Sequence, residues 1–457
     1  MHRVPPGLRK KWTILFMDDA ATTFTPGYVR YALALLVLTN VLNYMDRMIL
    51  SVVLEEIKAE FALSDTQSGI LAGFSFAIFY GTVGILIAQL ADRYSRRRII
   101  ALSMLAWSAV TALTGATQNF WQLFLARVGI GVGEAGVIPS ATSLVADYFV
   151  PAHRSVALAV LSTGATLGVV AGLGLGGWMA DLYGWRWAFV IAGIPGVPIS
   201  LLVWRTLRDP PRGLSDGRVQ TNDAAPSFIA SMRILLARKA YVHVVIGGCF
   251  ANFVLLGILP WLPAFMIRKF NIDTSQAGFF FGTAIGLGAA LGAVLGGIAA
   301  NRLVKRNIDW LVRIPLLTSF LYLPLYELAI FSNDVAVAFV LIFIINVVGG
   351  VSFGPMVAAM QSVVPPATRA TAAALYGFSV CLISTGGAPF LVGVLSDAFA
   401  SVEAHGSLQL ALAIAVLLSA AAPFHYARAL RWFRRDMADL DGTSNIGTRG
   451  QREIVAS

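Results

Sequence analysis

Three ionisable residues lie in stretches of the sequence that are otherwise almost entirely apolar. Asp46 lies within a long apolar run, and Arg127 and Glu134 lie seven residues apart in another. Seven residues make two turns of an α-helix, so Arg127 and Glu134 share one face at a separation of about 10 Å. Charged groups at membrane depth are costly and usually face a cavity or a partner. We therefore expect one buried polar site that contains all three, with Arg127 as the partner of Asp46.

The chemistry that such a site supports is reversible proton binding. A nearby arginine favours the ionised form of Asp46, whereas removal from water favours the protonated form. A carboxyl balanced between these effects can load and release a proton as its access to water alternates. Arg127 is also suited to an anionic head group, and Glu134 would be a second titrating or substrate-contacting group. The alternative is a static ion pair that holds two helices together.

The sequence offers no comparable set of residues for catalysis, metal binding or nucleotide binding. Its two cysteines and five histidines are scattered, which predicts neither a disulfide nor a metal site. Two G-x-G-x-x-G matches, at Gly131–Gly136 and Gly172–Gly177, follow no predicted strand, and no G-x-x-x-x-G-K-[ST] loop is present. We expect no enzymatic activity, no metal and no cofactor.

The elements that must position these residues are membrane-spanning helices. The 457 residues are 57% hydrophobic and 13% charged, whereas an ordinary soluble domain carries about 25% charged residues. A bilayer-spanning helix needs roughly 20 mostly apolar residues. Twelve segments qualify: Tyr28–Leu54, Ser68–Ala91, Ile99–Thr117, Trp121–Tyr148, Val156–Leu182, Trp185–Leu207, Tyr241–Ile267, Gln276–Ala300, Leu311–Phe331, Val335–Met360, Thr371–Phe399 and Ser407–Leu430.

The distribution of lysine and arginine predicts the orientation of these helices. Most lysines and arginines lie in the N-terminal segment, the even-numbered loops and the C-terminal tail, while the opposite loops hold only Lys58, Arg186, Arg268 and Lys269. The positive-inside rule then places both termini in the cytoplasm. Most of the net charge of +10 reflects this bias, which argues against nucleic-acid binding. No cleavable signal peptide is evident.

The chain divides into two six-helix bundles that look like copies of each other. Asp65-Thr-Gln-Ser-Gly69 resembles Asp273-Thr-Ser-Gln-Ala-Gly278, and Asp181 aligns with Asp397. Repeated halves are typical of secondary transporters, in which the substrate binds between the repeats. The predicted divisions are a cytoplasmic N-terminal segment (1–27), a first bundle (28–207), a cytoplasmic linker with a short surface helix (208–240), a second bundle (241–430) and a cytoplasmic tail (431–457).

The loop between the second and third predicted helices resembles the signature loop of the major facilitator superfamily. It reads Ala88-Gln-Leu-Ala-Asp92-Arg93-Tyr-Ser-Arg96-Arg97, with Ala88 and Ser95 in place of the usual glycines. Asn301-Arg302 is its degenerate echo in the second half. The resemblance covers nearly the whole chain. It implies an all-α integral membrane fold of two pseudo-symmetric bundles that works by alternating access.

A narrower resemblance is to the Spinster-like branch of that superfamily. It rests on Asn43-Tyr44-Met45-Asp46-Arg47, on Arg127-Val-Gly129-Ile-Gly131-Val-Gly133-Glu134-Ala135 and on Arg208-Asp209-Pro210-Pro211-Arg212-Gly213. The branch implies proton-linked transport of lysolipids or sphingoid lipids. The Asn-Tyr-x-Asp-Arg element also resembles organic-anion symporters, so transport of small organic anions such as sugar acids is an alternative. A membrane receptor or sensor is the alternative of another class.

The remaining predicted site residues follow from position within this plan. Asp46, Arg127 and Glu134 are assigned to proton coupling. The predicted substrate contacts are Asn43, Arg47, Arg127, Glu134, Asn252, Phe253, Trp261, Phe353 and Tyr376. A charge lock at the cytoplasmic ends is predicted from Asp92, Arg93, Asp147, Arg154, Arg302 and Arg369, for which helix-end capping is the alternative role. A cavity that is charged on one side and aromatic on the other suits an amphipathic substrate.

Four glycines, at 164, 168, 172 and 176, repeat every four residues and predict a helix-packing stripe. Leu173 stands where antiporters of the superfamily often carry proline, which weakens an antiport interpretation. The expected partners are a small-molecule or lysolipid substrate, protons and the lipid bilayer. The protein is expected to be a monomer in the inner cell membrane.

Overall fold

Helices are the only regular elements in the part of the chain that the computed structural model describes, residues 24–211, 227–401 and 406–455. The first half holds α2 (Pro26–Phe61), α3 (Asp65–Ala72), α4 (Phe74–Arg93), α5 (Arg96–Thr114), α6 (Phe120–Glu134), α7 (Val137–Tyr148), α8 (Pro151–Tyr183), α9 (Trp185–Gly193) and α10 (Gly196–Thr206). This confirms the predicted all-α fold class.

The second half begins after a short helix, α11 (Phe228–Ala237), which occupies the segment where the sequence predicts a surface helix. It holds α12 (Lys239–Asn252), the π-helix η2 (Phe253–Gly257), α13 (Trp261–Phe270), α14 (Thr274–Val304), α15 (Trp310–Phe331), α16 (Val335–Ser362), η3 (Pro366–Thr368), α17 (Arg369–Val380), the π-helix η4 (Cys381–Gly387), α18 (Ala388–Ala400), α19 (Ser407–Leu417), η5 (Leu418–Ala420) and α20 (Ala421–Val455). The predicted tail is thus helical as far as Val455.

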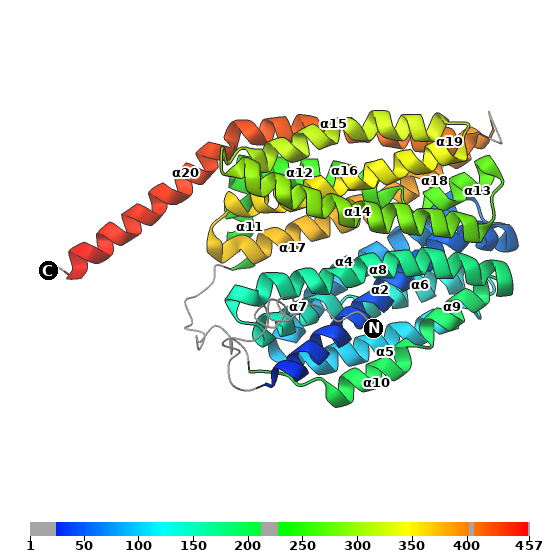
Figure 1. Cartoon of the computed structure of the whole chain (residues 1–457), viewed down its shortest axis with the longest axis horizontal. Coiled ribbons are helices and arrows are strands. Elements are labelled where there is room, and N and C mark those ends of the chain that lie inside the picture. The colour runs from blue at the N-terminus through cyan, green and yellow to red at the C-terminus, as the bar shows by residue number, and fades with distance from the viewer. Residues whose placement is uncertain (1–23, 212–226, 402–405, 456–457) are drawn as a thin grey trace, which may run out of the picture.

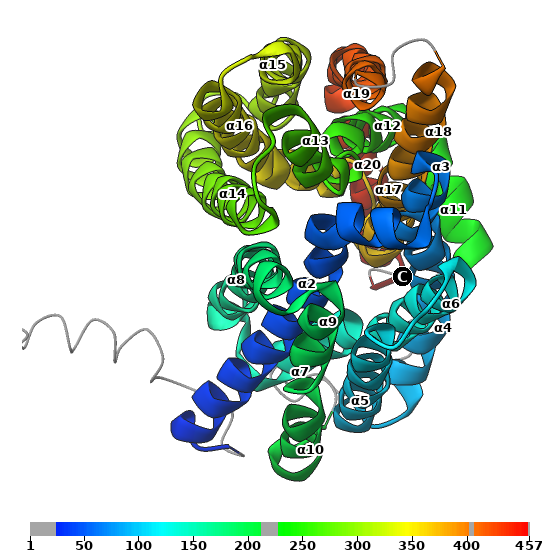
Figure 2. The same cartoon turned by 90° about the vertical axis from the view of Figure 1, so that its right-hand side faces the viewer.

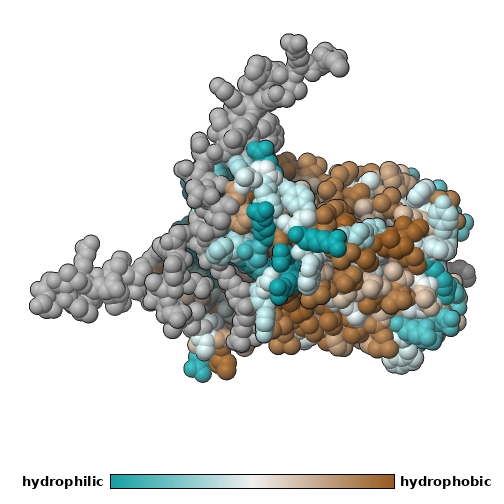
Figure 3. Space-filling view, turned by 90° about the horizontal axis from the view of Figure 1, so that it is seen from below, coloured by the Kyte–Doolittle hydropathy of each residue, from teal (hydrophilic) through white to brown (hydrophobic). Residues whose placement is uncertain are grey.

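Ten helices in the described part of the chain are long and apolar enough to cross a membrane. The second predicted span, Ser68–Ala91, is divided at Gly73 between α3 and α4, and the third corresponds to α5. α4 and α5 have 20 and 19 residues and run alongside the others (Figure 1). The space-filling view shows a hydrophobic belt between hydrophilic groups at the two ends (Figure 3). The molecule is an integral membrane protein with the helices that the sequence predicts.

The helices form two groups that follow the two halves of the sequence (Figures 1 and 2). We call the end where α10 ends and α11 begins the linker end, and the opposite end, which carries α9 and α13, the far end. The halves contact each other mainly through α8 with α14 and through α3 with α18. The principal joint between the halves therefore includes the far end, where α3 begins.

Six of the predicted spans are interrupted in the structure, and the seventh shows the reason most clearly. The sequence predicts a single helix over Tyr241–Ile267, but the structure has α12, then η2, and a break at Pro260 before α13. Proline lacks an N–H and clashes with the preceding turn, which explains a break at this point. π-helical turns are frequent at functional sites, and η2 packs against the second π-helix, η4.

The glycine stripe of α8 lets this helix lie directly against α2. A Cβ atom added at Gly164 would lie 2.7 Å from the carbonyl oxygen of Val37, and one added at Gly168 would lie 2.7 Å from Cβ of Tyr44. Backbones approach this closely only where small residues line the interface. The stripe is therefore a helix-packing face, as predicted, and it supports the helix that carries Asp46.

We predict that Gly168→Ala destabilises the protein by about 1–3 kcal/mol, because the added methyl group overpacks the α2–α8 interface. Gly174→Ala is the matched control on the same helix, since a Cβ atom there meets nothing within 4 Å. Thermal unfolding of the two purified variants measures the difference. Equal unfolding temperatures would contradict the assigned packing role.

Candidate functional site

Asp46 lies on α2 in the interior of the first half, with 3% of its surface exposed. Thr111 on α5 donates a hydrogen bond from Oγ1 to Oδ2 of Asp46. The other carboxylate oxygen, Oδ1, has no hydrogen-bond partner among the described residues. A buried charge without full pairing is unfavourable, and uptake of a proton relieves that cost. This geometry suits a carboxyl that gains and loses a proton.

Glu134 pairs with Arg47. The Arg47 Nε atom lies 2.5 Å from Oε2 of Glu134, and the two side chains are 16% and 0% exposed. The guanidinium carbon of Arg47 also lies 4.4 Å from the ring centroid of Tyr80 and 4.8 Å from that of Phe76. Cations are attracted to aromatic faces at such distances. Arg47 is therefore the more accessible member of this pair and is held by the rings of α4.

Arg127 lies beside these residues, but the predicted ion pair with Asp46 does not form in this conformation. Its Nε donates to the carbonyl oxygen of Leu71 over 3.4 Å, and its guanidinium carbon lies 5.2 Å from the ring centroid of Phe76. These contacts hold Arg127 against α3 and α4, while Asp46 accepts its hydrogen bond from Thr111. Gly131 makes room for α4 in this conformation, since a Cβ atom there would lie 2.8 Å from the Phe76 carbonyl oxygen.

We call the four ionisable residues Asp46, Arg47, Arg127 and Glu134 the central cluster. Four buried atoms of these side chains lack a hydrogen-bond partner among the described residues. They are Oδ1 of Asp46, Oε1 of Glu134, one terminal nitrogen of Arg47 (Nη2) and one of Arg127 (Nη1). Buried polar groups are nearly always paired, so such a set calls for an explanation. Free carboxylate oxygens can accept a proton, and free guanidinium nitrogens can donate to an anion. The arrangement can therefore bind both.

The second half contributes fewer polar groups to the predicted site. Asn252 donates from Nδ2 to the hydroxyl oxygen of Tyr376 over 2.9 Å, which joins α12 to α17. Phe253 is 5% exposed, and Trp261 is fully buried and donates to the Pro389 carbonyl oxygen. Phe353 is 56% exposed. The structure thus brings Asn252 and Tyr376 together and places Phe253 and Trp261 in the packed core in this conformation.

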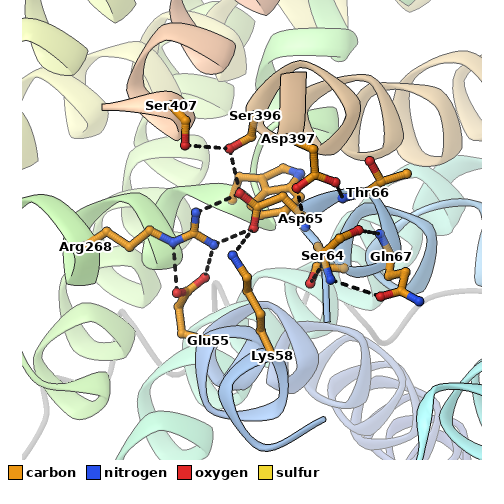
Figure 4. A network of polar contacts seen from close by, with 12 residues as sticks. Glu55, Lys58, Ser64, Asp65, Thr66, Gln67, Arg268, Ser396, Asp397 and Ser407 are labelled. Atoms are coloured by element: carbon orange, nitrogen blue, oxygen red, sulfur yellow. Dashed lines mark hydrogen bonds and ion pairs between the residues drawn. The ribbon is translucent and has the colours of Figure 1, made fainter. Parts of the chain in front are cut away.

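A second cluster of charges joins the two halves at the far end (Figure 4). Arg268 on α13 binds Glu55 on α2 through two hydrogen bonds of 2.9 and 2.6 Å. It also binds Asp65, at the start of α3, over 2.9 and 2.7 Å. Lys58 and Ser396 contact the same Asp65 carboxylate over 2.5 and 2.6 Å. We call these residues the far-end lock.

The far-end lock keeps Asp65 ionised. Burial alone would raise the pKa of the Asp65 carboxyl, but the hydrogen bonds and charge of Arg268, with Lys58 and Ser396, hold that pKa well below its usual range. Burial likewise disfavours the Arg268 cation, yet Asp65 and Glu55 raise its pKa above the usual value. Paired, partly buried charges of this kind are costly to separate.

Two aspartates reinforce the lock by binding backbone N–H groups of the opposite half. Asp397 on α18 accepts hydrogen bonds from the N–H groups of Asp65 and Thr66, over 2.9 and 2.8 Å. Asp181 on α8 accepts one from Ser275 at the start of α14, over 2.8 Å. Carboxylates are favoured at helix N-termini by the free N–H groups and the helix dipole. The two aspartates are equivalent in the repeat, so the halves cap each other reciprocally.

At the linker end, the conspicuous charge cluster lies within the first half. Arg96 is 1% exposed, and it pairs with Asp147 and donates to Asp209 over 2.9 Å. The predicted lock residues Arg302 and Arg369 are exposed at this end, and Arg154 has an interacting partner. The side chains of Asp92 and Arg93 lie outside the described part of the structure.

The sequence missed several of these residues although it held signals for them. Lys58 and Arg268 stand out as two of the four cations in the loops at the far end, but their positions in the sequence predict only orientation. Asp65, Asp181 and Asp397 indicate the repeat in the sequence and do not by themselves predict a contact between the halves. Thr111 carries no charge, and nothing in its local sequence distinguishes it from other hydroxyl residues on apolar helices.

Comparison with known proteins adds independent information. The family model described as Major Facilitator Superfamily matches residues 36–389. An MFS-type efflux pump of Mycolicibacterium smegmatis is 34% identical over 92% of this chain and 97% of its own length. The zebrafish (Danio rerio) sphingosine-1-phosphate transporter SPNS2 is 27% identical over 78% of this chain and 74% of its own.

A solved structure shares the fold closely. It is a bacterial homolog of the human lysosomal transporter Spinster in an inward-facing and unoccupied conformation. It superposes with a TM-score of 0.82 at 29% identity, over 90% of this chain and 99% of the other. The predicted family resemblance and its Spinster-like branch are thereby confirmed. The relatives are named as transporters, which agrees with the prediction that the chain is not an enzyme.

We predict that Asp65→Asn loosens the far end, because it removes the carboxylate that Arg268 and Lys58 share. The separation between spin labels at Gln118 and Asn333, exposed loop positions of the two halves, would then shift toward longer distances. Loss of one partner from an ion pair this deeply buried should increase the population of the separated state by roughly tenfold or more. Glu60→Gln is the control, since the Glu60–Arg186 pair is 43% and 35% exposed and lies within one half. An unchanged distance distribution in Asp65→Asn would refute the lock.

The pKa of Asp65 also sets the pH range of this contact. A carboxyl whose pKa is lowered by its partners stabilises the joined state fully above its ordinary pKa of about 4, and loses that effect only as the pH falls below it. The Gln118–Asn333 separation should therefore not change between pH 8 and pH 5. Separation of the far end within that range would show that another titrating group controls it.

Proposed function

The chain belongs to the Major Facilitator Superfamily, in its Spinster-like branch, and we propose that this integral membrane transporter moves an amphipathic, lipid-like solute coupled to protons. Its relatives support transport. The observation that carries the proton coupling is the central cluster, in which a buried carboxylate, Asp46, is hydrogen-bonded on one oxygen only.

The proposed coupling rests on charge balance. Asp46 and Glu134 contribute two negative charges, and Arg47 and Arg127 contribute two positive charges, so the cluster is neutral overall. A proton on Asp46 gives it a net positive charge, which strengthens binding of an anionic head group at the guanidinium groups. The coupling between two binding events is reciprocal, so a bound anion in turn favours proton binding at Asp46. Proton and anionic substrate would then bind together.

We propose that alternating access depends on the far-end lock and on a second set of contacts at the linker end. The lock joins the halves at the far end, and the structure resembles a relative described as inward-facing. We assign the linker end to the cytoplasm, with both termini on that side of the inner membrane. Opening of the far end would require the lock to break. Asp92, Arg93, Asp147, Arg154, Arg302 and Arg369 would then join the halves at the linker end.

The lipid-like substrate is supported by chemistry on two sides of the proposed cavity. Arg47, the partly exposed cation, is suited to a phosphate or carboxylate. Asn252 and Tyr376 offer a polar pair on the other half, and Phe353 offers an exposed aromatic surface. One relative is named a sphingosine-1-phosphate transporter. Sphingosine-1-phosphate joins an anionic head to an apolar chain, and we propose a substrate of this class. Small organic anions would use the cation without the apolar surface.

The test is proton flux in liposomes. We would impose a pH gradient, record lumenal pH, and add lysophospholipids or, separately, sugar acids to the wild-type protein, Asp46→Asn and Glu60→Gln. We expect lysophospholipids to drive a proton flux that Asp46→Asn abolishes and Glu60→Gln retains. Flux that persists in Asp46→Asn would remove Asp46 from coupling. Flux driven only by sugar acids would replace the lipid with a small organic anion, and uptake indifferent to the gradient would exclude proton coupling.

A further inference from the structure

The surface between α12 and α20 near the linker end carries a group of basic side chains far from the central cluster in sequence. Lys239 and His243 are one turn apart on α12, and His425 and Arg428 are three residues apart on α20. We call these four residues the basic patch. Lys239 and Arg428 are exposed, and the two histidines are partly exposed. Lys239 is the first residue of a membrane-crossing helix, which places the patch at a membrane–water boundary.

Contacts across the two helices hold the basic patch in place. The Nδ1 atoms of His243 and His425 lie 3.0 Å apart, so one ring donates a hydrogen bond to the other. The Lys239 Nζ atom lies 4.1 Å from the ring centroid of Trp432, and the Arg428 guanidinium carbon lies 5.2 Å from that of Phe424. Aromatic rings and the histidine pair therefore hold the patch in place, and these neutral groups do not compensate the positive charge of Lys239 and Arg428.

No carboxylate neutralises this charge within the described part of the chain. Neither Lys239 nor Arg428 forms an ion pair there. The nearest acidic group along the sequence of α20, Asp436, is buried and accepts the N–H of Ala240 over 2.8 Å. Asp439 lies 3.8 Å from Arg238, outside the patch. The charge of Lys239 and Arg428 is thus free to meet an external anion.

We propose that the basic patch binds the phosphate group of an anionic phospholipid of the surrounding bilayer. Arg428 offers planar N–H donors that match phosphate oxygens, and Lys239 adds a second charge one turn from the histidine pair. Phe424, which is 56% exposed, and Trp432 flank the patch as aromatic side chains do at membrane interfaces. Basic groups near an anionic membrane surface each contribute roughly 1 kcal/mol. The site is separate from the proposed transport route and does not depend on it.

The histidine pair does not favour a metal ion instead. Two imidazole nitrogens 3.0 Å apart could approach one divalent cation. However, no group of three or more His, Cys, Asp or Glu side chains suited to a metal occurs in the described residues, and Lys239 and Arg428 would repel a dication. The same positive charges attract phosphate.

Trp432 provides the probe for a direct test. The wild-type protein and Trp432→Phe would be reconstituted in phosphatidylcholine bilayers with equal mole fractions of dibrominated phosphatidylglycerol or dibrominated phosphatidylcholine. The difference between the two proteins isolates the fluorescence of Trp432. We expect brominated phosphatidylglycerol to quench this component more strongly. Lys239→Gln and Arg428→Gln should each reduce that preference by about fivefold, whereas Arg98→Gln, an exposed arginine at the start of α5, should not.

Each outcome bears on the proposal. Equal quenching by the two lipids, or a preference that survives the double variant Lys239→Gln/Arg428→Gln, would overturn it. A preference abolished by millimolar inorganic phosphate in the buffer would also overturn the lipid assignment, since the patch would then bind free phosphate. Unfolding temperatures of the variants, Trp432→Phe included, exclude misfolding, and the comparison of the two lipids needs no substitution of Lys239 or Arg428.

Discussion

The arrangement of this molecule depends on the cost of placing charge in an apolar medium. A charged side chain that lies away from the membrane–water boundary needs a partner, and the choice of partner decides which helices are joined. At the far end the partners belong to different halves, with Arg268 binding both Glu55 and Asp65. In the centre they belong to one half, with Arg47 binding Glu134. The first set joins the two halves, whereas the second lies within the first half.

This division separates two tasks that would otherwise compete. Asp65 keeps its charge because Arg268 and Lys58 hold its pKa low, so it serves as a constant attachment. Among the described residues, Asp46 accepts a hydrogen bond from Thr111 alone and keeps one oxygen unpaired. A carboxyl with few strong partners is the easier one to protonate, whereas a carboxyl with many keeps its charge. The two carboxylates differ in this respect although both lie in the first half.

The sequence predicts the helices, the repeat and the residues of the central cluster because each leaves a local trace. Apolar runs of sufficient length predict spans, and a charge within such a run is conspicuous. The partner of each charge leaves no such trace: Arg127 and Glu134 share a helix face, yet Glu134 pairs with Arg47 from another helix. Likewise, the role of Arg268 depends on its contact in space with Asp65, from which it is separated by some 200 residues in the chain. Side-chain pairing between helices follows from tertiary packing, which periodicity does not encode.

The two reciprocal caps at the far end differ in the number of hydrogen bonds that they make. Asp397 accepts two N–H groups beside the densely bonded Asp65, while the exposed Asp181 accepts one, at Ser275. The polar bonds between the halves are therefore concentrated on the α3–α18 side, where the far-end lock lies. Contact between α8 and α14 depends on small residues, since a Cβ atom added at Gly278 would lie 2.1 Å from the Leu173 carbonyl oxygen. One side of the joint is therefore sensitive to loss of charge, and the other to side-chain volume.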